Sequence, residues 1–247
     1  MIFRRHDKSI QPFPSEWRSI IADVFVPWHS LDESQRRRLE VLTAGLIDQK
    51  RWEGSKDFAV TAEMQVTIAV HAALLILDLD HRYYRKVSSV VVLPTTQVLR
   101  GQRAGPAQGV VTEEPMPIIG QAVLNGPVVI AWDAASNQAR HPERGHNVIY
   151  HEFAHKLDML DGAADGAPPI SSREEARRWT EVCQQEFEML RAGRGGHLLD
   201  AYGSVNPGEF FAVATEIFFN KPRPMLTDKP DLYDVLSGFY NQDPAHR

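Results

Sequence analysis

The chain has 247 residues, of which 43% are hydrophobic, and its 27 basic and 32 acidic residues give a formal net charge of −5. This length and composition supply enough apolar surface for a substantial core, so they exclude a disordered chain. The acidic balance lacks the basic surplus of proteins that bind nucleic acid through its phosphates, and we expect no direct nucleic-acid partner.

The first third of the chain has the pattern of helices. Ser15 and Asp32 are candidate N-caps of the first two predicted helices, and apolar residues recur at helical spacing after Asp32. A third helix is expected over about residues 61–79, so residues 1–80 are predicted to form a helical N-terminal part. The arginines near the N-terminus are not followed by the apolar stretch of a secretory signal, which leads us to expect a cytoplasmic protein.

Residues 66–77 form the longest apolar segment, and they include His71. A helix needs about 20 apolar residues to cross a bilayer, so this shorter segment predicts a buried helix and no membrane partner. The single cysteine, Cys183, excludes an intramolecular disulfide and a cysteine-rich zinc site.

After residue 80 the periodicity changes to that of strands. Residues 86–94 form a β-branched run closed by a proline, and residues 121–132 contain two apolar runs around Asn125-Gly126. Both turn residues tolerate a positive φ, which makes this pair a strong hairpin signal. We therefore expect an α+β fold, mostly helical with a small, mainly antiparallel sheet. The whole chain is predicted to be a single domain, in which residues 81–247 hold the sheet and the functional helices.

His151, Glu152 and His155 lie in an otherwise apolar helical segment, NVIYHEFAHKLDML. Two histidines four residues apart project from one face of a helix and can bind the same ion. A glutamate next to the first histidine lies at the edge of that face, where it can act as a general base on a water molecule. The alternative to a metal site is that this spacing of two histidines and a glutamate arose by chance and that Glu152 forms an ion pair at the surface. The apolar context favours a buried site for one Zn²⁺ per chain, because unpaired buried charge is costly.

The third ligand of such a site has two candidates. No third histidine follows the motif as in the extended metzincin pattern, so the ligand is expected farther along the chain. Glu209 and Glu216 lie seven residues apart in a predicted late helix, hence nearly on one face. Glu209 also fits a capping box with Asn206 as the N-cap, whereas Glu216 lies among apolar residues and equally needs a partner. Spacing alone does not decide which of the two glutamates is the third ligand.

Three segments of the sequence resemble the family of Mlc titration factor A, MtfA. They are HEFAHKLDM, which contains the motif, DAYGSVNPGEFFAVATEIFF and FYNQDP. The family consists of cytoplasmic zinc peptidases whose catalytic part is similar to that of anthrax lethal factor. The resemblance therefore implies a zincin-like metallopeptidase of gluzincin type, with aminopeptidase activity on short peptides.

The resemblance also implies roles for individual residues. The family's zinc ligands match His151, His155 and Glu209. Glu152 matches the base that activates water, and Tyr202 matches a tyrosine that supports the oxyanion. Glu216 and Asp158 then become candidates for orienting the ligand imidazoles through their other ring nitrogens.

The implied partners belong to two classes. One is a peptide substrate. The other is a transcriptional repressor of the Mlc type, because family members are implicated in binding this glucose-responsive repressor. Sequestration of a repressor could then be the main role and peptidase activity a secondary one. No residue of the sequence identifies a repressor-binding surface.

Overall fold

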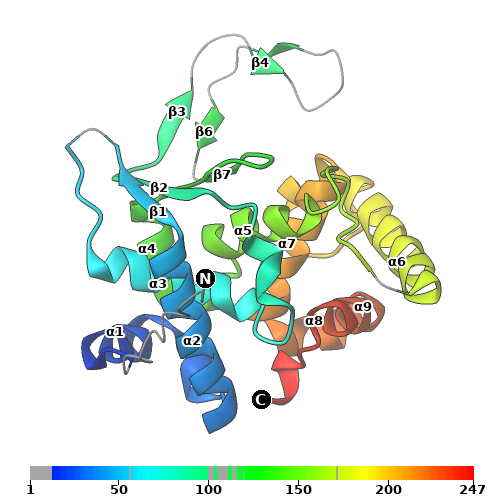
Figure 1. The fold of residues 1–247 in the computed structure, drawn as a ribbon. Helices are drawn as coiled ribbons and strands as arrows, with labels where there is room; N and C mark the ends of the chain where they lie inside the picture. Colours follow the sequence, from blue (N-terminus) through cyan, green and yellow to red (C-terminus); the bar gives the residue numbers. More distant parts are fainter. Residues whose placement is uncertain are drawn as a thin grey trace, which may run out of the picture.

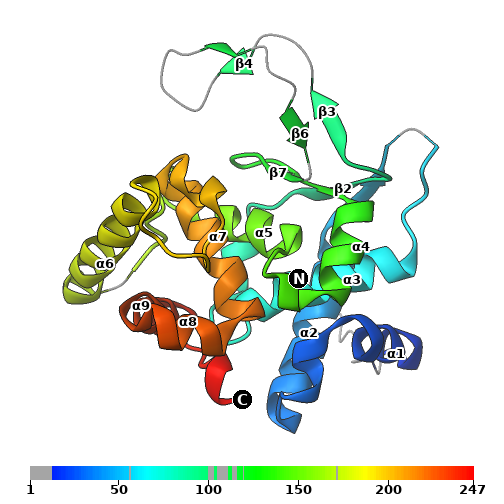
Figure 2. The same ribbon diagram turned by 180° about the vertical axis from the view of Figure 1, so that it is seen from behind.

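The computed structural model of the chain describes residues 13–55, 57–99, 103–104, 111–112, 116–118, 120–170 and 172–247. Figures 1 and 2 show a helical body with a small sheet above its centre. No described helix is both long enough and apolar enough to span a membrane.

The described N-terminal part contains α1 (Ser15–Val24), α2 (Glu33–Gln49) and α3 (Ala62–Leu75). As predicted, Asp32 caps α2, because its carboxylate accepts the Gln35 backbone N–H at 2.9 Å in a capping box. Ser15 is instead the first residue of α1, with Pro14 at the cap position. From Val66 onward α3 is buried on all sides, as its apolar sequence predicts.

The main sheet is formed, in this order, by the described strands β1 (Arg51–Gly54), β2 (Ser89–Leu93), β8 (Val128–Ala131) and β7 (Gly120–Ala122). β1 pairs parallel to β2 and β2 parallel to β8, whereas β7 pairs antiparallel to β8. The expectation of a mainly antiparallel sheet is therefore wrong for this sheet, which is mixed. The reason is the crossover through α3, which returns the chain to the sheet in the direction of β1.

Strand β1 also interrupts the predicted helical part, residues 1–80. It is four residues long, and its residues alternate between exposed and half-buried without the apolar run that signals a strand. The predicted β7–β8 hairpin is confirmed, and its turn holds Asn125 at φ 54° next to Gly126. Above the main sheet in Figure 1 lie two short antiparallel pairs: β3 (Gln97–Leu99) with β6 (Met116–Ile118), and β4 (Arg103–Ala104) with β5 (Val111–Thr112).

The further described α-helices are α4 (Trp132–Arg140), α5 (Val148–Asp158), α6 (Arg173–Arg191), α7 (Pro207–Asn220), α8 (Pro222–Asp228) and α9 (Pro230–Tyr240). α5 lies at the centre, between the sheet and α7 (Figures 1 and 2). The core runs through this contact, where Phe153 and Leu157 of α5 and Phe211 and Phe218 of α7 are buried. This apolar packing fixes α5 against α7 and brings their polar residues together at a shared edge.

Candidate metal centre

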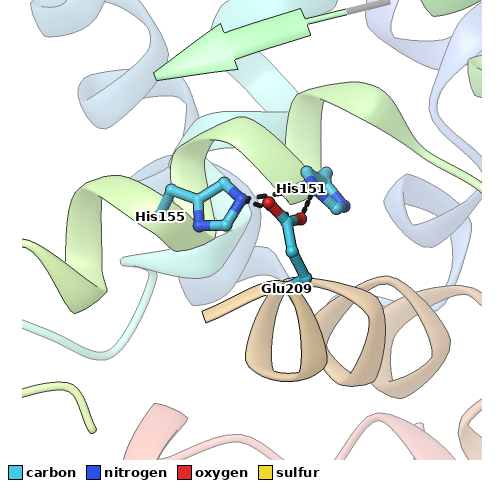
Figure 3. Close-up of side chains that lie close together, drawn as sticks. All are labelled: His151, His155 and Glu209. Atoms are coloured by element: carbon cyan, nitrogen blue, oxygen red, sulfur yellow. Dashed lines mark hydrogen bonds and ion pairs between the residues drawn. The ribbon is translucent and has the colours of Figure 1, made fainter. Parts of the chain in front are cut away.

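The motif helix α5 begins at a side-chain cap. The Asn147 side-chain oxygen accepts the backbone N–H groups of Ile149 and Tyr150, each at 3.1 Å. The apolar residues of α5 are buried in the core, and the face that carries His151 and His155 turns towards the start of α7 (Figure 3). The two imidazoles, four residues apart, therefore present their rings to the same space, with ring centroids 4.9 Å apart.

Helix α7 brings Glu209 to this space. Its N-cap is Asn206, whose side-chain oxygen accepts the Glu209 backbone N–H at 2.9 Å. The Glu209 carboxylate lies between the two imidazoles (Figure 3). Its Oε2 is 2.9 Å from His151 Nε2 and 3.3 Å from His155 Nε2. Glu209 therefore occupies the expected third position of the helix through its backbone N–H, but its carboxylate contacts the histidines, and the reciprocal bond of a capping box is not formed.

The spacing of these atoms fits one cation. The two Nε2 atoms are 3.3 Å apart, and the three ligand atoms lie within 4.8 Å of one another. Ligands held tetrahedrally about 2.0–2.1 Å from a zinc ion are separated from one another by about 3.3 Å. Two imidazole nitrogens and one carboxylate oxygen are also a donor set that zinc prefers, so the residues fit the ion.

Glu216, the other glutamate of α7, lies on the opposite side of the His151 ring. Its Oε1 is 2.8 Å from His151 Nδ1, and its Oε2 accepts the Asn147 backbone N–H at 2.5 Å. Glu216 is buried and cannot reach the space between the Nε2 atoms while it makes these contacts. The structure therefore separates the two glutamates that spacing left open: Glu209 faces the shared space, and Glu216 orients His151 from behind.

The carboxylates control the charge of His151. Burial lowers the pKa of His151, but hydrogen bonds to Glu209 and Glu216 outweigh burial and raise it to about 10. Burial raises the pKa of Glu209, and the hydrogen bonds from His151 and His155 outweigh this effect and lower it to about 2. Glu209 is thus ionised at neutral pH, the form that binds a cation.

Asp158 does not orient His155 in the way expected of it. Asp158 is fully buried, and its Oδ2 accepts the Gly166 backbone N–H at 3.0 Å. Its Oδ1 and the Nδ1 of His155 are both buried without a hydrogen-bond partner among the described residues. Burial raises the pKa of Asp158 to about 6. Buried polar atoms are ordinarily paired, but four further unpaired atoms in the described part of the chain, in Thr43, Thr67, Tyr84 and Asn220, show that this feature is not specific to the cluster.

Glu152 and Tyr202, the expected catalytic residues, both lie next to this cluster. Glu152 is 5% exposed, and burial raises the pKa of its carboxyl group while the neighbouring histidines oppose the shift. Tyr202 lies on the 3-10 helix Ala201–Ser204 and is 41% exposed, with its ring 6.0 Å from that of His151. Burial and the nearby Glu209 and Glu152 carboxylates raise the pKa of Tyr202, so its phenol stays protonated and can donate.

Two further residues at the site were not singled out by the sequence. Gly120 of β7 lies so close to Glu152 that a Cβ at position 120 would overlap the Glu152 carboxylate. Lys156 follows His155 directly and is buried beside the β7–β8 turn. A lysine among apolar residues in the motif helix was a visible signal, whereas nothing in the sequence around Gly120 marks it.

The chain matches the family described as Glucose-regulated metallo-peptidase M90 over residues 2–241. The chain belongs to this family. It is 34% identical over 238 residues to an uncharacterized protein of Synechocystis sp. The matched region covers 95% of this chain and 86% of the relative. It is 32% identical over 242 residues to Mlc titration factor A of Serratia proteamaculans, and the match covers 94% of this chain and 89% of that relative. It is 34% identical over 226 residues to Mlc titration factor A of Edwardsiella ictaluri, and the match covers 88% of this chain and 84% of that relative.

A metallopeptidase of the M90 family needs side chains that hold a metal ion. In the part of the chain that the structure describes, one group of His, Cys, Asp and Glu side chains has the spacing for an ion, and it consists of His151, His155 and Glu209. Family membership thus implies a metal ion, and the local geometry offers His151, His155 and Glu209 as its candidate site.

Proposed function

We propose that the chain is a zinc-dependent peptidase that hydrolyses peptide bonds within a single zincin-like domain. The observation that carries this proposal is the convergence of His151 Nε2, His155 Nε2 and Glu209 Oε2 next to the buried Glu152 carboxylate. These three side chains would hold one zinc ion per chain. A bound zinc ion supplies a Lewis acid that polarises a peptide carbonyl and lowers the pKa of water towards about 7.

Two residues beside the cluster would assist the reaction, one by transferring protons and the other by donating a hydrogen bond. The Glu152 carboxylate would accept a proton from the attacking water and pass it to the leaving amine. Burial raises the pKa of Glu152, which is the direction that favours a carboxyl group that both takes and releases a proton. The Tyr202 phenol would donate a hydrogen bond to the oxygen on which negative charge develops, an interaction that is stronger in the transition state.

Strand β7 supplies a place for the substrate backbone. It is the last strand in the order of the main sheet, so its outer edge has no described strand beside it. An extended peptide can add to such an edge through backbone hydrogen bonds. Because Gly120 puts the β7 backbone directly against Glu152, a peptide on this edge would run past the base and the metal ligands.

Substitution Glu152→Gln tests the mechanism. It keeps the size of the side chain and removes the base, so zinc content should stay at one ion per chain. Turnover of short peptides should fall by about 10²- to 10⁴-fold. Comparing peptides with free and with blocked N-termini decides whether the activity is of the aminopeptidase type that the family resemblance implies. Cleavage by the variant at the rate of the parent would rule out Glu152 as the base.

A second function is favoured by the name of two relatives, Mlc titration factor A. We propose as the alternative that the chain binds a transcriptional repressor of the Mlc type in the cytoplasm, with peptidase activity secondary. His155→Ala separates the two functions, since it removes a metal ligand. If this variant still binds the purified repressor with the affinity of the parent, binding does not require the metal centre, and sequestration is supported. Loss of the cellular phenotype in Glu152→Gln would instead support catalysis as the main role.

A further inference from the structure

The Lys156 side chain ties the motif helix to the β7–β8 turn. Its ammonium group donates hydrogen bonds to the backbone carbonyls of Val123 at 2.5 Å and Gly126 at 2.9 Å. Lys156 is 5% exposed, and the structure gives it no salt bridge within the described residues. Burying a lysine without a carboxylate partner is unfavourable, so its two bonds to the turn are what compensate for burial of its charge.

The turn does not need Lys156 in order to close. Within it, the Gly126 N–H donates to the Val123 carbonyl at 2.8 Å, and the Val123 N–H donates to the Pro127 carbonyl at 3.1 Å. Asn125 adopts the positive φ that such a turn requires. What Lys156 adds is therefore the position of the hairpin relative to α5. Apolar packing does little to fix the tip, because Val123 and Leu124 are 38% and 45% exposed.

The other end of β7 lies close against Glu152. Glu152 and Lys156 lie four residues apart, hence on the same face of α5 and separated by about 6 Å along its axis. β7 begins at Gly120, which lies against Glu152, and runs into the turn at Val123, which accepts a hydrogen bond from Lys156. The strand thus lies along one face of the motif helix, with a close approach at its start and hydrogen bonds from the buried Lys156 at its end.

We propose that Lys156 is a positioning residue that fixes the free edge of β7 against α5 and so sets the register of a bound peptide relative to Glu152 and the metal ligands. This inference rests on the proposed peptidase function and identifies the element that aligns its substrate. The substrate it implies is an extended peptide segment read through its backbone.

The test compares Lys156→Met and Lys156→Arg with the parent protein and with a matched control, Lys86→Met. Lys86 also donates to a backbone carbonyl, that of Leu160 at 2.9 Å, and this carbonyl does not belong to the hairpin turn. The first measurement is amide hydrogen exchange across residues 120–131, with and without added zinc. Lys156→Met should speed exchange there by about 10- to 100-fold, because a bond from a charged donor is lost from each of two carbonyls. The parent rate should persist in Lys86→Met and largely return in Lys156→Arg.

The second measurement is the steady-state kinetics of the zinc-loaded proteins on short peptides. Lys156→Met should raise KM by about tenfold with a much smaller change in kcat and unchanged zinc content, the pattern of binding lost equally from the ground state and the transition state. Lys156→Arg should restore KM. If Lys156→Met does not fold, Lys156→Gln takes its place.

The results separate this inference from the proposed function. Unchanged hairpin exchange in Lys156→Met overturns the anchoring role, whatever the enzyme does. Faster exchange with an unchanged KM overturns the role in substrate register. If the zinc-loaded parent cleaves no peptide, the proposed function fails and the register role falls with it, while hydrogen exchange still decides the anchoring.

Discussion

At the residue scale, the two glutamates of α7 differ in the nitrogen of His151 that they face. Glu209 faces Nε2 at 2.9 Å, and Glu216 faces Nδ1 at 2.8 Å. An imidazole binds an ion through one nitrogen, and the partner of the other nitrogen fixes its orientation. His155 also presents its Nε2 to Glu209, so the side shared by both histidines is the side of Glu209.

This difference predicts opposite effects of two substitutions on zinc binding. Glu209→Ala should leave no stoichiometric zinc after dialysis, because one of three ligands is gone. Glu216→Gln should keep one zinc ion per chain and weaken its affinity by about 10- to 100-fold, the usual effect of losing a partner that orients a ligand. Elemental analysis and competition with a chromogenic chelator measure both. Glu188→Gln on the exposed surface of α6 is the control, and the reverse pattern would assign the ion to Glu216.

His71 shows what burial does to an imidazole that has no carboxylate beside it. It is 2% exposed on α3, its Nδ1 is 2.8 Å from the Thr67 carbonyl oxygen, and its ring packs against Phe25 and Tyr150. Burial lowers the pKa of His71 from 6.5 to about 4, and the hydrogen bond to Thr67 only partly opposes the shift. His71 is therefore neutral in the folded protein at neutral pH.

This shift predicts a loss of stability in acid. The unfolded chain binds a proton at His71 near pH 6.5, whereas the folded chain binds it near pH 4. The free energy of unfolding should therefore fall as the pH falls through this window, by about 1.4 kcal/mol per pH unit and about 3 kcal/mol in total. Urea unfolding of the parent and of His71→Leu, both in chelator, measures the difference in slope. Parallel curves for the two proteins would contradict the prediction.

At the scale of elements, β7 and α5 lie closer together than a side chain at position 120 allows. The glycine at this position is needed for close approach and not for an unusual φ, because Gly120 lies in a regular strand outside the positive-φ region. Its contact is with the Glu152 carboxylate, so the spacing of the two elements directly limits where the proposed base can lie.

Gly120→Ala should therefore damage catalysis without removing the metal. The added methyl group overlaps the Glu152 carboxylate, which must rotate away or push β7 outwards, and kcat/KM should fall by at least about tenfold, because small displacements of positioned groups are costly. Zinc content should not change. The control is Gly238→Ala on α9, where a Cβ meets nothing within 4 Å and the better helix propensity of alanine should stabilise slightly. Parent activity in Gly120→Ala would show that the two elements can separate freely.

The elements that could be predicted from the sequence are those whose signals are local. The Asp32 cap, the Asn125-Gly126 turn and the motif helix each depend on residues close together in the chain. Strand β1 and the parallel direction of β2 could not be predicted, because four residues with no apolar run form a strand only when a distant partner is present. Likewise, the choice between Glu209 and Glu216 depends on how α7 is rotated against α5.

At the scale of the whole molecule, the candidate centre lies where two distant parts of the chain meet. α5 and α7 are separated in sequence by the long helix α6, and their apolar faces pack together in the core. The histidines and Glu209 lie at the edge of this contact, with side chains 11–18% exposed, and α5 also contacts the edge strand β7 (Figures 1 and 3). A metal ion held there would link the two helices, and the sheet would supply the surface for the substrate.

The most direct test of this centre is anomalous diffraction at the zinc absorption edge from crystals of the zinc-loaded protein. We expect one peak per chain, about 2.0–2.2 Å from His151 Nε2, His155 Nε2 and a Glu209 carboxylate oxygen. No peak among these three side chains, or a peak bound by Glu216 in place of Glu209, would contradict the proposed zinc centre.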